Sequence, residues 1–406
     1  MERVYIVGGL RSHLGLKNGI FKSIPPEQLG AALLRQLCVR YPQAREADIL
    51  YCGNAVGSGG NVGRFMSLLA GLPKEMPAVT VDMQCASAAE AIALGYAKIR
   101  SGLADVALCG GVESCSMQPL RRYQPWDSRY TPEGYYTAQF SPDSNSPRVM
   151  LEGAERTAQV FGVSRQELDA WAVRSHKKAL AARQSHVLDP YVASLFGSSR
   201  DESIRKAMSP KLAGRMHTLF TPGETRALLT AEERQQAGET TPALTAANAC
   251  LTQDGAAFLL LVSGSRLQQW RREGRSSVPR GEILGCAEIG VDPRFSPLGA
   301  LEVGDALLHK LGTSPEEIDD FEYNEAFAVI SALFARRYPG LTERYLPLGG
   351  ALAYGHPYGA SGAVLVLHAL AGLKAVGGAL GLCAIAGAGG TGTALLVERL
   401  YGGKDD

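Results

Sequence analysis

The chain has 406 residues, of which 46% are hydrophobic and 20% are charged, and its formal net charge is +1. This length and composition indicate a globular protein of two or more packed units. The near-neutral charge argues against a nucleic-acid partner, and eight cysteines without paired spacing argue against a disulfide framework. We recognise neither a targeting segment nor an apolar stretch long and uninterrupted enough to span a bilayer, and we expect a cytoplasmic protein without a membrane partner.

Strand-like and helical patterns alternate in the first part of the chain. Residues 4–9 and 48–55 are typical of strands, and the intervening residues 25–37 have the pattern of a helix. Residues 104–114 are again strand-like. This alternation predicts an α/β fold with a mostly parallel sheet covered by helices on both faces.

Residues 80–102 form the most informative segment. A short β-rich run stops at Cys85 and turns at once into an alanine-rich helix that ends at Gly102. Unpaired backbone N–H groups and the positive end of the helix dipole lower the pKa of a thiol at this position. We therefore expect Cys85 to be a reactive thiolate, and the alternative is a small buried residue, the usual role of a free cysteine.

The character of the chain changes between residues 119 and 245. The segment is polar, aromatic and rich in proline, and it contains a charged amphipathic helix over 164–183 with a serine cap. We interpret it as a loop domain that covers a substrate site. A second α/β half follows and resembles the first in its glycine-flanked turns, which hints at an internal duplication. The predicted division is 1–118 with 246–275, then 119–245, then 276–406.

Three further motifs supply the parts of a cysteine-based acyl transfer. Asn324 and Glu325 lie where a strand-like run meets a helix, and His356 lies between Gly355 and Pro357. A glycine-rich turn follows residue 386. Together with Cys85 these motifs provide a thiol, an imidazole base, an amide and exposed backbone N–H groups.

With these motifs, the chain resembles the thiolases, the acyl-CoA C-acyltransferases, over nearly its full length. The resemblance implies a five-layered αβαβα fold of two related halves with a loop domain, and a homodimer or homotetramer. The matching motifs are GNAVGSGGNVGR from residue 53, QCAS at 84–87, GGVES at 110–114, TAANAC at 245–250, DGAA at 254–257, NEAFA at 324–328 and GGALAYGHPYGASGA at 349–363.

The resemblance also implies roles for single residues. Cys85 would receive the acyl group, and His356 would activate it. His356 and a water held by Asn324 would stabilise the oxyanion of the second half-reaction. The backbone N–H groups of Cys85 and of the loop at Ala388 and Gly389 would form the other oxyanion hole. The alternatives are a loop histidine fixed by its neighbours for His356 and a helix cap for Asn324.

Coenzyme A is the implied acyl carrier, with acyl-CoA and CoA as substrates and no tightly bound cofactor. By resemblance, Arg205 would lie near the adenine and phosphates, and Met150 and Cys250 would also line the CoA site. The alternative for Arg205 is a solvated loop charge. No spacing typical of metal ligands occurs, so the sequence predicts no metal site.

The chain departs from the thiolase pattern at the second catalytic cysteine. Alignment of the last hairpin puts Ala386 at this acid–base position and Ala388 in place of a glycine. Cys383 lies three residues upstream, so in a regular strand its side chain points to the opposite face. Loss of a positioned acid–base group costs about two to four powers of ten in rate. Ala386 is either an introduced change or a feature of a natural branch of the family. Further departures from the thiolase pattern, at Asp82, Ala88, Val149 and Cys250, favour the natural branch.

The sequence thus predicts a ping-pong acyltransferase that works through an acyl-Cys85 thioester. It would use acyl-CoA for Claisen condensation, or it would cleave 3-ketoacyl-CoA by thiolysis. Because Ala386 replaces the acid–base cysteine, the alternative is acyl transfer or hydrolysis without carbon–carbon chemistry. A third possibility is a degenerate thiolase homologue without catalytic activity.

Overall fold

The computed structural model describes residues 1–57, 59–144, 146–275 and 278–400. Its strands before residue 270 are β1 (Val4–Ser12), β2 (Gly15–Leu16), β3 (Ile49–Gly53), β4 (Ala78–Val81), β5 (Val106–Ser114), β6 (Val192–Ala193) and β7 (Gln253–Ser263). The later strands are β8 (Gly281–Gly290), β9 (Asp320–Tyr323), β10 (Leu380–Gly387) and β11 (Thr391–Arg399).

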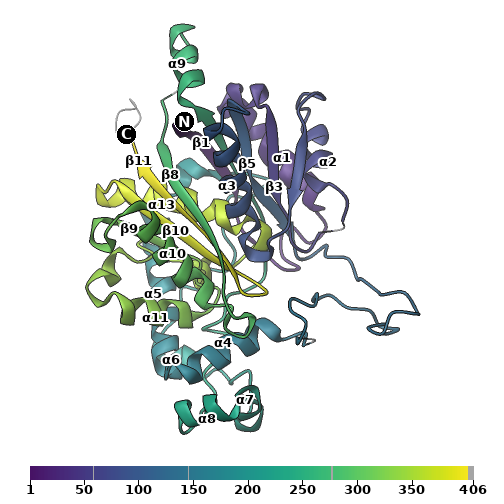
Figure 1. Cartoon of the computed structure of the whole chain (residues 1–406), viewed down its shortest axis with the longest axis vertical. Coiled ribbons are helices and arrows are strands. Elements are labelled where there is room, and N and C mark those ends of the chain that lie inside the picture. The colour runs from purple at the N-terminus through teal and green to yellow at the C-terminus, as the bar shows by residue number, and fades with distance from the viewer. Residues whose placement is uncertain (58, 145, 276–277, 401–406) are drawn as a thin grey trace.

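These strands form one mixed sheet in the order β4-β3-β5-β7-β1-β8-β11-β10-β9 (Figure 1), with β2 and β6 paired to β7 and β1. A short antiparallel ladder between Val4–Ile6 of β1 and Gly281–Ile283 of β8 joins the two halves. The α/β class is confirmed, but the prediction of a mostly parallel sheet is wrong. The reason is that β7 and β11 each run antiparallel to both of their long neighbours.

The helices of the first half are α1 (Pro26–Arg40), α2 (Val62–Leu69), α3 (Ser87–Arg100) and α9 (Gly264–Arg272). Those of the second half are α10 (Leu298–Leu311), α11 (Ala328–Arg337), α12 (Ala351–Tyr354) and α13 (Ser361–Val376). The helices between β5 and β7 are α4 (Val149–Val160), α5 (Arg165–Gln184), α6 (Pro210–Ala213), α7 (Pro222–Leu228) and α8 (Ala231–Ala237).

Three core clusters separate the layers of the molecule. The inner cluster packs α3 and α13 between the two halves of the sheet, with Ile92 and Leu367 fully buried. One outer cluster covers the first half with α1, where Leu33 is buried. The other covers the second half with α10 and α11, through Leu301 and Phe334. Helix, sheet, helix, sheet and helix follow one another, as the αβαβα prediction requires.

Close packing of α3 against α13 brings the two halves together at their helix N-termini. A Cβ atom at Gly362 of α13 would lie 2.2 Å from the backbone nitrogen of Ala89 of α3, so only glycine permits this approach. The residues that precede these two helices include Cys85 and His356. The contact therefore positions the candidate site at the seam between the halves.

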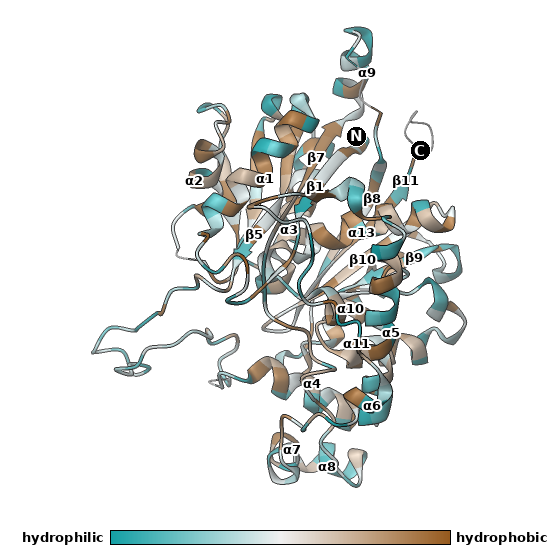
Figure 2. Cartoon of the chain, turned by 180° about the vertical axis from the view of Figure 1, so that it is seen from behind, coloured by the Kyte–Doolittle hydropathy of each residue, from teal (hydrophilic) through white to brown (hydrophobic). Residues whose placement is uncertain are grey.

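One helical stretch of the described chain, Tyr358–Val376, is long and apolar enough to cross a membrane, and 83% of it is buried. The prediction that no stretch has this length and composition is therefore wrong. The helix lies in the middle layer and has protein on all sides, and hydrophobic residues mark it and the central strands (Figure 2). Its apolar character is explained by the core that it fills.

The segment between β5 and β7 begins with an extended excursion that projects from the body (Figure 1), where Arg121 bridges to Tyr135. Helices α4 and α5 then return to the body, and α5 packs on α11 and α12. Helix α5 matches the predicted amphipathic helix, because Ser164 caps it by accepting a hydrogen bond from the Glu167 nitrogen at 3.2 Å.

Candidate active site

Cys85 lies in a tight turn, Gln84–Ala86, between β4 and α3. Gln84 has a left-handed backbone with φ of 53°, which costs a non-glycine residue about 1–3 kcal/mol. The Asp82 carboxylate holds it in place, since one oxygen accepts from the Gln84 backbone and side-chain nitrogens, both at 2.9 Å. The Ser87 hydroxyl donates to the Gln84 carbonyl at 2.5 Å. These bonds fix the turn that presents the Cys85 thiol.

The pKa of Cys85 differs from the prediction. Burial, together with the nearby Glu113 charge, raises the pKa of this half-buried thiol to about 12. Backbone hydrogen bonds from Cys85 and Ala388 lower the pKa, but by less. The expectation of a ready thiolate is therefore wrong, because loss of hydration outweighs the field at the helix end. Cys85 is a neutral thiol that needs a base.

The hairpin between β10 and β11 closes over the Cys85 turn. A Cβ atom at Gly387 would lie 2.8 Å from the Met83 carbonyl oxygen, so glycine permits the contact. The next residue, Ala388, directs its N–H at the Cys85 sulfur. Gly389 has φ of 84°, and a Cβ there would lie 2.8 Å from the Phe140 carbonyl oxygen. The excursion therefore lies directly on the glycine-rich turn.

His356 is buried just after α12, and its ring is fixed on both sides. Nδ1 lies 2.6 Å from the Ser361 hydroxyl, and Nε2 lies 3.5 Å from the Asn324 amide nitrogen. Because an amide NH₂ can only donate, Nε2 is the acceptor and Nδ1 carries the proton. Burial lowers the pKa of His356 to about 3. The imidazole is therefore neutral, and its unprotonated nitrogen is Nε2.

Asn324 follows β9 and is held by its backbone. Its N–H donates to the Ala384 carbonyl at 2.8 Å, which fixes it beside β10. Helix α11 starts at Ala328 with Phe327 as its N-cap, so the alternative role of Asn324 as a helix cap is wrong. Its amide is instead directed at His356.

Glu325, the residue after Asn324, is a buried carboxyl that joins two helices. It is buried and accepts hydrogen bonds from the Ser175 hydroxyl of α5 and from the Ser331 hydroxyl of α11, the latter at 3.0 Å. Burial raises the pKa of Glu325 to about 7. The residue therefore ties two helices together directly behind Asn324.

Ala386 faces the outer core of the second half. Strands β10 and β11 pair in unbroken register from Leu380 to Gly387, so no bulge changes the faces. Half-buried Ala386 packs with the cluster of α10, and a Cβ at Gly299 would lie 3.5 Å from its methyl group. Cys383 belongs to the inner cluster instead. The prediction that Cys383 points to the opposite face is confirmed.

Two residues that sequence reasoning missed hold the site together. Ser361 fixes the His356 ring, and it lies five residues after His356 within a motif that was recognised. Glu113, in the GGVES motif, is buried and accepts hydrogen bonds from the Asn54 side chain and from the Ala55 and Gly359 backbones. Burial raises the pKa of Glu113 to about 7. Its carboxyl joins the loop after β3 to the turn that follows His356.

The three residues predicted at the CoA site lie on different segments. Half-buried Met150 lies in the first turn of α4 and packs on the same cluster as Ala386. Arg205 follows the anchored Asp201 loop, and its backbone N–H donates to His176 Nδ1 at 3.1 Å. Cys250 is half-buried, and its pKa is affected by Cys85. Of the three residues, Cys250 is the one that interacts with the Cys85 thiol.

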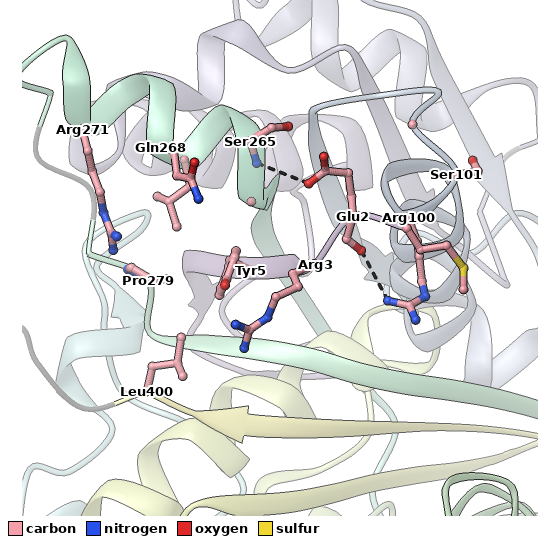
Figure 3. A pocket seen from close by; sticks show the side chains of 14 residues that line it. Glu2, Arg3, Tyr5, Arg100, Ser101, Ser265, Gln268, Arg271, Pro279 and Leu400 are labelled. Carbon is pink, nitrogen blue, oxygen red and sulfur yellow. Dashed lines mark hydrogen bonds between the residues drawn. The ribbon is translucent and has the colours of Figure 1, made fainter.

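A cavity of about 790 Å³ opens elsewhere, between the start of β1, the end of α3 and α9 (Figure 3). Glu2 lines this cavity, where its carboxylate accepts a hydrogen bond from the Ser265 backbone and its carbonyl accepts one from Arg100. None of the candidate catalytic residues lines it. Within the described ranges, no cluster of three or more His, Cys, Asp or Glu side chains could hold a metal ion.

Comparison with known protein families agrees with this geometry. Residues 4–265 match the model of the thiolase N-terminal domain, and residues 277–399 match that of the thiolase C-terminal domain. The chain belongs to the thiolase family. As a thiolase homologue it is an acyltransferase, the class to which its named relatives belong.

Curated thiolases align with almost the whole chain. The β-ketoadipyl-CoA thiolase of Acinetobacter baylyi is 33% identical over 98% of this chain and 100% of its own length. The steroid 3-ketoacyl-CoA thiolase FadA6 of Mycobacterium tuberculosis is 30% identical, over 98% and 95%. The crystal structure of the Bacillus anthracis acetyl-CoA acetyltransferase superposes with a TM-score of 0.86 at 27% identity, covering 98% and 99% of the two chains.

Proposed function

We propose that this thiolase transfers acyl groups by a ping-pong reaction through an acyl-Cys85 thioester. The observation that carries the proposal is the convergence of two backbone N–H groups, from Cys85 and Ala388, on one sulfur. His356 and Asn324 place a neutral imidazole and an amide in contact with each other, and Tyr358, whose ring meets the His356 ring, interacts with Cys85. Donors arranged in this way stabilise the oxyanion of acyl transfer.

The first half-reaction follows from these positions. Nε2 of His356 takes the proton of Cys85, and the thiolate attacks the thioester carbonyl of an acyl-CoA. The N–H groups of Cys85 and Ala388 receive the oxyanion, and the CoA thiolate leaves. Proton removal by a positioned base is needed here, because the thiol has a raised pKa.

The second half-reaction passes the acyl group to an acceptor. We propose that His356 and a water held by Asn324 stabilise its oxyanion. For Claisen condensation the acceptor is an acyl-CoA carbanion, and for thiolysis of a 3-ketoacyl-CoA the acceptor is CoA. The second candidate function is transfer or hydrolysis without carbon–carbon chemistry. It is favoured by the apolar surroundings of Ala386, whose methyl group cannot move a proton.

We propose that coenzyme A binds under the loop domain 119–245, with Arg205, Met150 and Cys250 in contact with it. A structural relative, the Acat5 thiolase of Ascaris suum, was solved in complex with coenzyme A; it superposes with a TM-score of 0.83 at 28% identity, covering 98% and 100% of the two chains. This supports the proposal that CoA thioesters are the substrates. The contact between Phe140 and the glycine-rich turn agrees with a domain that covers the site.

We also propose that the protein is a cytoplasmic homodimer or homotetramer. Strand β4 is at one end of the sheet order, and Val79 on it is exposed. The adjacent helix α2 exposes Phe65, Leu68 and Leu69. An uncovered sheet edge beside apolar side chains favours pairing with a second copy. Light scattering of the eluting protein tests this, and a monomer at micromolar concentration would contradict it.

Isotope exchange tests the ping-pong proposal without knowledge of the acceptor. An acyl-enzyme returns its acyl group to free CoA, so labelled CoA should enter unlabelled acetyl-CoA with no second acyl substrate present. Exchange that needs an additional acceptor would contradict the ping-pong mechanism. A lack of exchange with acetyl-CoA and with longer acyl-CoAs would leave the non-catalytic homologue as the explanation.

A further inference from the structure

Cys250 lies on a segment that contacts the Asn324 turn. Its backbone N–H donates to the Ala326 carbonyl at 2.9 Å, and the Ala326 N–H donates to the Asn324 carbonyl at 2.8 Å. The preceding residue, Ala249, forms an antiparallel bridge with Phe327. Cys250 is therefore anchored by main-chain bonds to the turn that presents the Asn324 amide.

The same segment also contacts the His356 turn. The Leu251 carbonyl accepts from the His356 N–H at 2.9 Å, and Thr252 bridges to His356. The Thr252 hydroxyl lies 3.2 Å from the Tyr358 hydroxyl, and the Tyr358 ring meets the His356 ring edge-on at 5.1 Å. In an extended chain, alternate side chains share a side. Cys250 therefore faces the same side as Thr252, toward Tyr358, whose pKa it raises.

Cys250 is also a half-buried thiol that lies close enough to Cys85 to interact with it. All eight cysteines lie in the described chain, and the half-buried ones are Cys85, Cys250 and Cys286. Burial raises the pKa of Cys250, and the nearby Cys85 thiol raises it further; the same two thiols also raise the pKa of Tyr358. Cys286 lies on β8 and is affected by Glu288, Lys310 and Glu90. Of these three thiols, Cys85 and Cys250 share one space.

Other titratable groups near Cys85 are already occupied or enclosed. The Glu113 carboxyl accepts bonds from Asn54 and from several backbone N–H groups. Cys115 is buried. Burial raises the pKa of Tyr358, whose hydroxyl is paired with Thr252. Apart from His356, which serves Cys85, Cys250 is the group positioned to meet an acceptor.

We propose that Cys250 is the acid–base residue of the second half-reaction and supplies the function that Ala386 lacks. The inference rests on the proposed acyl-Cys85 mechanism. It explains two departures from the thiolase pattern together, because a cysteine stands at 250 where serine is common and an alanine stands at 386 where cysteine is expected. One thiol has been lost on β10, and another is present on the segment between the catalytic turns.

The proton balance of the step is closed. His356 first passes the proton of Cys85 to the departing CoA thiolate and then takes the proton of Cys250. The Cys250 thiolate takes a proton from C2 of the acceptor acetyl-CoA, and the electron pair of that C–H bond forms a carbon–carbon bond to the carbonyl carbon of acetyl-Cys85. The C–S bond to Cys85 breaks, and the departing Cys85 thiolate takes the proton that His356 holds, which leaves Cys250 as a thiol and His356 neutral. The products are acetoacetyl-CoA and the starting protein.

The test compares Cys250→Ser with Cys286→Ser, a matched change of the other half-buried thiol. Two rates are measured: acetylation of Cys85 by intact mass, and release of C2 hydrogens of acetyl-CoA into deuterated water with formation of acetoacetyl-CoA. We expect Cys250→Ser still to take one acetyl group onto Cys85 when acetyl-CoA is saturating, because a change at the CoA site alters the acetyl-CoA concentration needed and not the nucleophile. Hydrogen exchange and condensation should fall by about 10²–10⁴-fold at the same saturating concentration. Cys286→Ser should retain both rates.

Adding Ala386→Cys to Cys250→Ser should restore both lost activities, which a merely damaged fold would not allow. Unchanged hydrogen exchange in Cys250→Ser, or no exchange in the parent protein despite acetylated Cys85, would overturn the role of Cys250 and leave the acyl-enzyme proposal standing. Absence of acetylation in the parent protein would instead overturn the proposed function itself.

Discussion

The two positions at which the resemblance to thiolases predicts a cysteine, residues 85 and 386, differ sharply in this molecule. The turn at Cys85 is held by the Asp82 and Ser87 hydrogen bonds and packs against the turn Tyr358–Ala360, which follows the neutral imidazole of His356. Ala386 lies in the regular β10–β11 ladder and presents a methyl group to the apolar cluster of α10. The comparison teaches that the machinery for acyl transfer to Cys85 is separate from the machinery that prepares an acceptor.

The largest effect is expected at the nucleophile. Cys85→Ser should abolish exchange of labelled CoA with acetyl-CoA, because a hydroxyl in this buried site is far harder to ionise than a thiol. Thermal unfolding should show that the variant keeps its fold. If the variant still exchanges CoA at the parental rate, the Cys85 thiol is not the group that carries the acyl group.

A cysteine at residue 386 tests the second of the two positions. Ala386→Cys should raise acetoacetyl-CoA formation by about 10²–10⁴-fold, since it returns a positioned acid–base group. Residue 386 is half-buried, so its side chain is partly open to solvent. Ala386→Ser is the matched control, similar in size but without a thiol. An equal gain in both variants would show that space, and not proton transfer, limits the reaction.

A smaller effect is expected at the residue that holds the imidazole. Ser361→Ala removes the partner of His356 Nδ1 and leaves a buried N–H unpaired, at a cost of about 1 kcal/mol. The rate of CoA exchange should fall about fivefold with little change in KM. Ser361→Thr keeps the hydroxyl and should recover most of the rate. Equal rates in the alanine and threonine variants would contradict this positioning role.

The buried carboxyl behind Asn324 should affect stability with pH. The folded-state pKa of Glu325 is raised to about 7, so the folded protein binds more protons than the unfolded chain between about pH 5 and 7. The free energy of unfolding should therefore fall as pH rises through this window. Glu325→Gln should reduce that slope by up to about 1.4 kcal/mol per pH unit. Denaturant titrations at several pH values measure it, and identical slopes would contradict the assignment.

Some features of the site could be predicted because they depend on local pattern. Strand alternation alone places Cys383 on the face opposite to Ala386, and the unbroken register agrees. The helix cap at Ser164 follows from its residue type and spacing. The family motifs also indicated the αβαβα fold, because their order along the chain reflects how the two halves pack.

Other features depend on tertiary packing and could not be predicted. The raised pKa of Cys85 results from burial by the β10–β11 hairpin and from Glu113, which is 28 positions away in the sequence but adjacent in the fold. The antiparallel course of β7 depends on its pairing with β5 and β1. The apolar helix α13 looks like a membrane span by composition, and only the surrounding sheet explains it.

The central claim is that Cys85 becomes acylated although residue 386 is alanine. The most direct measurement is the intact mass of the protein after brief mixing with acetyl-CoA, followed by peptide mapping. The account predicts one added acetyl group, carried by the peptide that contains Cys85 and absent from Cys85→Ser. An unchanged mass with acetyl-CoA and with longer acyl-CoAs, or an acetyl group on another residue, would contradict it.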